Sequence, residues 1–303
     1  MKTENSKSKT LIITAWVFLL LASSLPRIIL QEVFHHQISN DLSFGIAAIV
    51  VLAGLVLTFA WQAVQALQPF FILFLTLVGI EWVVFTRLDQ LPLYSSWLAN
   101  PSFNVFMLAN QSLRLVVSVV IIAVLFVLRK SRAAFFLIKG DTSASVEPVS
   151  WLGIKEGETW NKAGRIFAIV ISLGTLTFLV LAGRPPLDIV IRALPFLPAV
   201  LLAAMLNAFN EELTYKASFL SVLEDVVGRP QALLLMAAYF GIGHFYGIPY
   251  GVIGVLMAGF LGWLLGKSML ETRGFWWAWF IHFWQDVIIF IFLAIGSITP
   301  GGV

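Results

Sequence analysis

Long apolar runs, separated by short polar breaks, make up most of this chain. A membrane-spanning helix needs about 20 apolar residues, and each run reaches or approaches that length. The pattern therefore predicts an all-α, polytopic helical membrane protein with about eight to nine transmembrane helices. The nine runs are Thr10–Leu30, Phe44–Ala66, Phe70–Phe85, Leu113–Leu128, Ile166–Gly183, Phe196–Leu223, Ala232–Phe245, Tyr250–Gly266 and Phe275–Ile295.

The composition agrees with this pattern and excludes several classes of function. Hydrophobic residues make up 59% of the chain and charged residues 12%, whereas soluble proteins carry about 25% charged residues. The net charge is only +3, and no basic cluster alternates with aromatic residues, so we expect no nucleic acid as a partner. The chain has no cysteine, which excludes disulfides, thiolate metal sites and a cysteine nucleophile.

One long polar stretch, Arg129–Arg165, interrupts the apolar runs. It holds seven Lys or Arg residues against four acids, so the positive-inside rule places it in the cytoplasm. Lysines near the start of the chain place the N-terminus there too, and the four runs between them are consistent with this. Within the stretch, Trp151 to Trp160 can form an amphipathic helix on the membrane surface. We therefore divide the chain into an N-terminal four-helix transmembrane region (1–128), a cytoplasmic loop (129–165) and a C-terminal helical-bundle core (166–303).

Two adjacent glutamates, Glu211 and Glu212, lie in the middle of an apolar run. A charged group at membrane depth costs about 2.5–3.5 kcal/mol on insertion scales, and such groups usually mark a functional site. On a helix, Glu212 and Lys216 share a face and can pair. Glu211 points about 100° away from Glu212, so it stays free for chemistry. The alternative is that both glutamates only stabilise helix packing.

Two histidines and one aspartate also lie inside later apolar runs. His244 follows Phe240 by four residues, so the two side chains share a helix face. His282 and Asp286 have the same spacing and face one partner together. Taken alone, His244 can be a satisfied core residue, and His282 and Asp286 can simply be hydrogen-bonded to each other.

Together, Glu211, His244, His282 and Asp286 come from three separate crossings. Each would be costly to leave unpaired in lipid, so the least costly arrangement turns all three helix faces towards one another. Glutamate can take a proton from water, and histidine can orient that water or stabilise an oxyanion. The pattern therefore predicts a hydrolytic site.

These residues resemble the motif set of the type II CAAX prenyl endopeptidases, also called the CPBP or Abi family of intramembrane proteases. That set reads Glu-Glu-x-x-x-Arg, then Phe-x-x-x-His, then His-x-x-x-Asn/Asp, and the resemblance covers about residues 150–300. Lysine replaces the usual arginine, which keeps the charge but loses the planar guanidinium fork. The matching residues here are Glu211-Glu212-x-x-x-Lys216, Phe240-x-x-x-His244 and His282-x-x-x-Asp286.

The resemblance implies an intramembrane endopeptidase whose partners are membrane lipid and a peptide or membrane-protein substrate, prenylated at a CAAX-type terminus in eukaryotic members. Glu211 would activate water with help from His244, and Glu212 would support Glu211. His282, with Asp286, would hold the scissile carbonyl oxygen. We expect the membrane to be a prokaryotic cell membrane.

Members have been described as glutamate proteases and as metalloproteases, and the sequence leaves both open. Glu211, His244, His282 and Asp286 are all acceptable zinc ligands. If all four bound zinc, Glu212 would be the remaining base.

Two weaker pairs of residues and two alternative functions complete the expectations from the sequence. Glu81 and Arg114 can pair across helices, and Asn207 and Asn210 can hydrogen-bond to neighbouring helices. A catalytically inactive protein of the same fold, acting in immunity or as a scaffold, is an alternative to the protease. A proton-coupled transporter ranks last, because the sequence shows no internal repeat.

Overall fold

The computed structural model describes residues 2–88, 90–98 and 102–298, and most of these residues are helical. They form no strand beyond two isolated β-bridges in the polar stretch. The α-helices are α1 (Lys2–Ala22), α2 (Leu25–Ile28), α3 (Asn40–Ala60), α4 (Gln68–Val83), α5 (Pro92–Leu98), α6 (Phe103–Val127), α7 (Trp160–Gly183), α8 (Leu187–Ala193), α9 (Leu197–Glu211), α10 (Ser218–Val227), α11 (Arg229–Gly243), α12 (Val252–Thr272) and α13 (Trp276–Ile298). Shorter turns are π-helical at η1 (Ile29–Val33), η3 (Val84–Leu88) and η6 (Glu212–Ala217), and 3₁₀ at η2 (Gln62–Leu67), η4 (Ser150–Leu152) and η5 (Leu194–Phe196).

The helix lengths confirm the predicted fold class. Seven helical stretches of the described chain are long and apolar enough to cross a membrane, and an eighth forms if the pair Ser8–Ala22 and Leu25–Val33, bent by 49°, is one span. Of the nine predicted runs, Ala232–Phe245 corresponds to α11, whose 15 residues fall short of a full crossing. The run predicted from Leu113 begins earlier, because the Ser102 side chain caps the start of α6.

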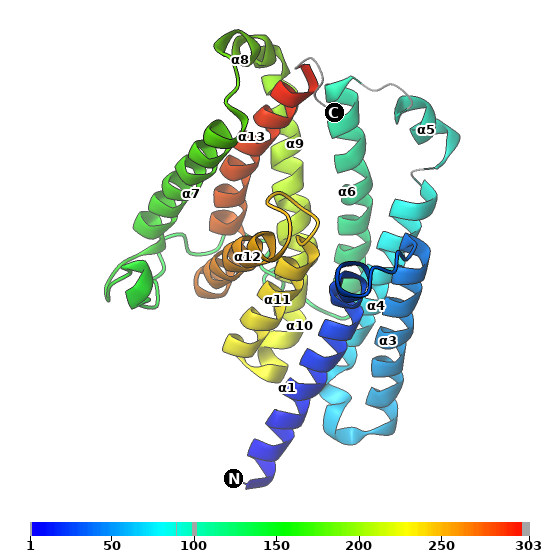
Figure 1. Cartoon of the computed structure of the whole chain (residues 1–303). Coiled ribbons are helices and arrows are strands. Elements are labelled where there is room, and N and C mark those ends of the chain that lie inside the picture. The colour runs from blue at the N-terminus through cyan, green and yellow to red at the C-terminus, as the bar shows by residue number, and fades with distance from the viewer. Residues whose placement is uncertain (1, 89, 99–101, 299–303) are drawn as a thin grey trace.

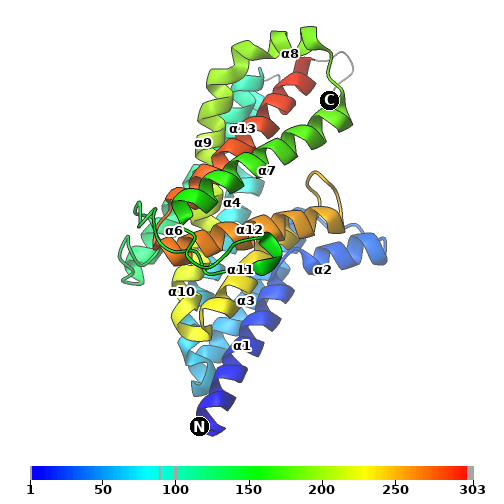
Figure 2. The ribbon, with the colours of Figure 1, turned by 90° about the vertical axis from the view of Figure 1, so that its left-hand side faces the viewer.

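One nearly continuous helical run forms the middle of the molecule. It consists of α9, η6 and α10 and carries both glutamates. Figure 1 shows this run descending through the centre, with α6 on one side and α13 on the other, and both helices contact α9. Figure 2 shows α12 crossing the bundle at a steep angle to α13, and α11 packs along α12. This arrangement brings the residues of the second and third motifs, at α11 and on α13, towards the glutamates.

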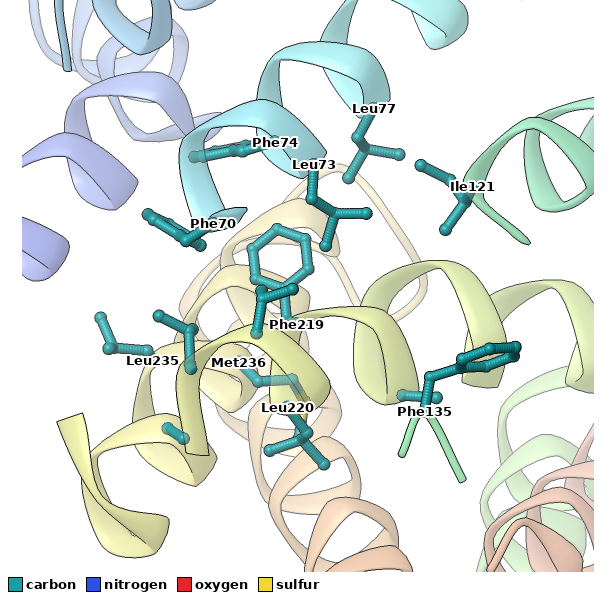
Figure 3. Packing of buried hydrophobic residues seen from close by; sticks show 14 of the residues in the cluster. Phe70, Leu73, Phe74, Leu77, Ile121, Phe135, Phe219, Leu220, Leu235 and Met236 are labelled. Carbon is teal, nitrogen blue, oxygen red and sulfur yellow. The ribbon is translucent and has the colours of Figure 1, made fainter. Parts of the chain in front are cut away.

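A large apolar core joins the N-terminal helices to the C-terminal ones. Figure 3 shows Phe70 and Phe74 of α4 beside Phe219 of α10. Their ring centroids lie 5.8 and 5.4 Å from that of Phe219, and Tyr239 of α11 stacks on Phe219 at 5.0 Å. Such aromatic pairs contribute about 0.5–1.5 kcal/mol each beyond burial alone. The core therefore fixes α4 and α11 against the run that holds the glutamates.

The amphipathic helix predicted from Trp151 to Trp160 does not form. Only the 3₁₀ turn η4 lies in this segment, and Gly153 and Gly157 have φ angles of 73° and 83°, which a right-handed helix cannot contain. The segment instead folds over the C-terminal helices. The indole nitrogen of Trp160, the first residue of α7, donates a hydrogen bond to Glu271 Oε2 at 2.8 Å.

Gly241 lies where the backbones of α11 and α12 approach each other closely. A Cβ atom there would lie 2.7 Å from the carbonyl oxygen of Val255 and 2.9 Å from Cα of Gly259. Because these are backbone atoms, we expect Gly241→Ala to lower the free energy of unfolding by about 1–3 kcal/mol. Thermal unfolding in detergent measures this, with Gly243→Ala as the control, since a Cβ at Gly243 meets nothing within 4 Å. Equal stability of the two variants would contradict the close approach at Gly241.

Candidate active site

The two glutamates lie at the junction of α9 and η6. Glu211 ends the α-helix, and the π-helical turn begins at Glu212. A π turn inserts one extra residue into the helix and often occurs at functional sites. The Glu211 side chain is 13% exposed and that of Glu212 is fully buried, so the two adjacent carboxylates have different surroundings.

Glu212 is held by a buried cation, as predicted. Lys216 Nζ lies 2.7 Å from Glu212 Oε1, and neither side chain has any exposed surface. The ammonium also lies 3.4 Å from the ring centroid of Phe240 on α11, which is cation–π geometry. The first two motifs therefore meet through Lys216. Glu212 Oε2 has no hydrogen-bond partner among the described residues.

His282 of α13 lies between the three acids. Its Nδ1 is 2.7 Å from Glu212 Oε1. Its Nε2 is 3.8 Å from Glu211 Oε2 and 3.5 Å from Asp286 Oδ1, both longer than an ordinary hydrogen bond. The ring is thus fixed through Nδ1, while Nε2 faces two carboxylates without a tight bond to either.

Asp286 is oriented by buried amides. Asn207 Nδ2 donates to Asp286 Oδ2 at 3.0 Å, and Gln111 Nε2 on α6 donates to Asn207 Oδ1 at 3.0 Å. Asn210 donates to Gln111 and accepts a hydrogen bond from Ser118 Oγ at 2.8 Å. The predicted hydrogen bonds of Asn207 and Asn210 to neighbouring helices are therefore confirmed.

His244 occupies a looser position than predicted. It follows α11 as the cap residue, and its Nδ1 lies 2.7 Å from the carbonyl oxygen of Phe240. It is near enough to Glu211 for electrostatic interaction, but among the described residues no hydrogen bond or ion pair joins it to Glu211, Glu212, His282 or Asp286. Three of the four key residues therefore meet closely, and His244 lies at the edge of the group.

The loop after His244 is held by the bent N-terminal segment. The Tyr246 hydroxyl donates to Gln31 Oε1 at 2.8 Å, and the Arg27 guanidinium lies 5.6 Å from the Tyr246 ring centroid. A hydrogen bond to Glu32 raises the pKa of Tyr250, in the same loop, to about 12. These contacts set the position of the segment that carries His244.

Two residues of α6 were not identified as site residues from the sequence. Gln111 belongs to the amide chain described above, and Arg114 Nη1 lies 3.7 Å from Glu211 Oε1. Among the described residues Arg114 forms its ion pair with Glu211 rather than with Glu81, which is near enough for a weaker electrostatic attraction and accepts a hydrogen bond from the Tyr215 hydroxyl. The sequence does contain a feature that could have identified them. Gln111, Arg114 and Ser118 follow one another at spacings of three and four residues, which places all three on one helix face.

A small pocket opens beside Glu211. Its free space, about 10 Å³, is close to what one water molecule needs. The polar groups around it can supply the hydrogen bonds that such a water requires. The lining residues are Phe85, Arg114, Val117, Asn210, Glu211, Thr214 and Tyr215.

The residues named above as zinc ligands do not form a metal site in this arrangement. Across residues 2–88, 90–98 and 102–298, no group of three or more His, Asp or Glu side chains is placed to hold a metal ion. His282 Nε2 lies near Glu211 and Asp286, but among the described residues no hydrogen bond or ion pair joins His244 to these three.

Comparison with known proteins identifies the family of the site region. The family model of the Rce1-like type II CAAX prenyl endopeptidases matches residues 193–288, a stretch that includes all five predicted site residues. No curated protein and no solved structure matches the chain. With its membrane-spanning helices, the protein is an integral membrane protein. The chain thus carries an Rce1-like domain of the type II CAAX prenyl endopeptidase (CPBP) family in residues 193–288.

Proposed function

We propose that this protein is an intramembrane endopeptidase in which Glu211 activates the attacking water. The observation that carries the proposal is the position of Glu211, whose partly exposed carboxylate lines a water-sized pocket and faces His282. Glu212, in contrast, is fully buried and paired with Lys216. Of the two adjacent acids, only Glu211 can reach a water molecule and a substrate.

The proposed reaction begins with proton transfer from water to the Glu211 carboxylate. The oxygen of the water then attacks the scissile carbonyl carbon and forms a tetrahedral oxyanion. The same carboxyl group passes its proton to the leaving amine as the C–N bond breaks, so no other reactant is needed. General acid–base catalysis of this kind contributes about 10²–10⁴-fold to the rate.

His282 is the proposed donor to the carbonyl oxygen. The Glu212 carboxylate accepts a hydrogen bond from Nδ1, so a protonated His282 can also donate from Nε2, which is 3.5 Å or more from both other acids, to a substrate oxygen placed between them. Asp286 lies beside Nε2 and limits the rotation of the ring. His244 lies near Glu211 and would assist the water.

The proposed substrate is a membrane-associated peptide with a prenylated, CAAX-type C-terminus. The family match supports this substrate class, and the position of the site among membrane-spanning helices suits a substrate whose lipid chain lies in the bilayer. An unprenylated peptide would have to enter the apolar region without that anchor.

The test is cleavage by the full-length protein reconstituted in liposomes. Three peptides are compared: a prenylated CAAX-type peptide, the same peptide without the lipid, and a membrane-spanning peptide without the CAAX terminus. Mass spectrometry identifies the cleaved bond. We expect cleavage of the prenylated peptide near its C-terminus and none by Glu211→Gln. If the wild type cleaves none of the three, the protein acts without catalysis and the proposal fails.

A further inference from the structure

One helix outside the Rce1-like domain reaches the site directly. Gln111 and Arg114 are three residues apart on α6, so they share one helix face, and α6 packs against α9. We propose that α6 completes the active site, with Arg114 positioning Glu211 and Gln111 positioning Asp286. This inference rests on the proposed protease function and assigns two further residues to it.

Arg114 is directed at Glu211 from the pocket side. Its Nη1 lies 3.7 Å from Glu211 Oε1, and the guanidinium lies 5.8 Å from the ring centroid of Phe85. Glu211 is the one carboxylate with which it forms an ion pair among the described residues. His282 approaches the other oxygen of Glu211, Oε2, at 3.8 Å. The carboxylate is therefore flanked on both oxygens, and its orientation depends on Arg114.

Gln111 acts one step further from the reacting atoms. Its side chain is 3% exposed and donates to Asn207, which donates to Asp286. Its oxygen accepts a hydrogen bond from Asn210 at 3.4 Å, so the amide is anchored at both ends. Buried polar groups in such a chain hold each other in one arrangement. Without Gln111, Asn207 Oδ1 loses the hydrogen bond that orients the Asn207 amide towards Asp286.

If Arg114 and Gln111 position the catalytic groups, replacing them has a kinetic effect that a loss of helix packing alone would not have. A small displacement of a catalytic group can cost about 10²-fold in rate, while the substrate still binds through its lipid and peptide chain. The loss should thus fall on kcat rather than on KM. A lysine in place of Arg114 keeps the cation near Glu211 and should restore part of the rate.

The experiment compares Arg114→Gln, Arg114→Lys and Gln111→Leu with the wild type in full-length protein in liposomes. The matched control is Arg87→Gln, which also removes an arginine–carboxylate pair, the one between Arg87 and Asp41 at 3.0 Å, whose side chains are 56% and 50% exposed. We expect Arg114→Gln to lower kcat about 10–100-fold with KM nearly unchanged. Arg114→Lys should have a higher kcat than Arg114→Gln and recover at least a third of the decrease in log kcat. Gln111→Leu should lower kcat about 10-fold.

Thermal unfolding of each variant separates positioning from folding. We expect Arg114→Gln to unfold within a few degrees of Arg87→Gln. The proposal is overturned if Arg114→Gln cleaves as fast as Arg87→Gln, if its rate falls only in proportion to folded protein, or if Arg114→Lys is as slow as Arg114→Gln. Cleavage by Arg114→Gln together with none by Glu211→Gln would reject the role of α6 and keep the protease function. No cleavage by the wild type would reject both.

Discussion

Replacing Glu211 by glutamine is expected to abolish peptide cleavage, with a loss of about 10²–10⁴-fold in kcat. Glutamine keeps the shape of the side chain but cannot take a proton from water. The amide also removes the negative charge that faces Arg114 and His282. Because Glu211 is partly exposed in a polar pocket, we expect the variant to fold, and its thermal midpoint should stay close to that of the wild type.

The control for this variant is Glu224→Gln on α10. Glu224 belongs to the same helical run and is also ion-paired, with Arg273 Nη1 at 2.6 Å, but it is far from the pocket lining. Loss of activity in Glu211→Gln with retention in Glu224→Gln identifies the charge at Glu211 as the required one. Retained activity in Glu211→Gln would transfer the role of base to another acid and reject the proposed reaction.

The second large effect is on stability. Lys216→Met is expected to lower the free energy of unfolding by about 3–5 kcal/mol, because it leaves the Glu212 carboxylate buried without its cation. Both side chains are fully buried in the native protein, and Glu212 Oε2 already has no hydrogen-bond partner among the described residues. His282 alone would then face the charge.

Two further variants are compared with Lys216→Met. Lys162→Met breaks a lysine–glutamate pair of the same i, i+4 spacing, with Glu158 at 2.8 Å, but Lys162 is 61% exposed, so the expected cost is only about 0–1 kcal/mol. The double change Lys216→Met with Glu212→Gln removes both charges and should recover most of the lost stability. Thermal or denaturant unfolding in detergent measures all three variants. Equal losses for Lys216→Met and Lys162→Met would refute the buried pair.

The sequence predicted the helices well because apolar run length is a local property. The α9–η6–α10 run, the α13 helix and the spacing of Glu212 with Lys216 follow from residues close together in the chain. The motif order likewise identified the Rce1-like domain. Local predictions failed at Gly153 and Gly157, where glycine changes the backbone, and at the start of α6, which the Ser102 cap places earlier than predicted.

The contacts of α6 with the site could not be predicted in this way. Gln111 pairs with Asn207, 96 positions later in the chain, and Arg114 faces Glu211 rather than Glu81. Lipid is as apolar as the helix surfaces, so hydropathy does not specify which helices pack together. Such partners depend on side-chain packing and on interhelical hydrogen bonds.

By itself, then, the sequence determined that this chain forms membrane-spanning helices and that Glu211, Glu212, His244, His282 and Asp286 are its candidate chemical groups. Only the tertiary structure decided which of them meet. It buried Glu212 with Lys216, left Glu211 at a pocket, placed His244 beyond the end of α11 and brought Arg114 from the N-terminal region. The physical reason is that periodicity fixes the face of one helix, whereas the pairing of faces depends on close packing across the whole bundle.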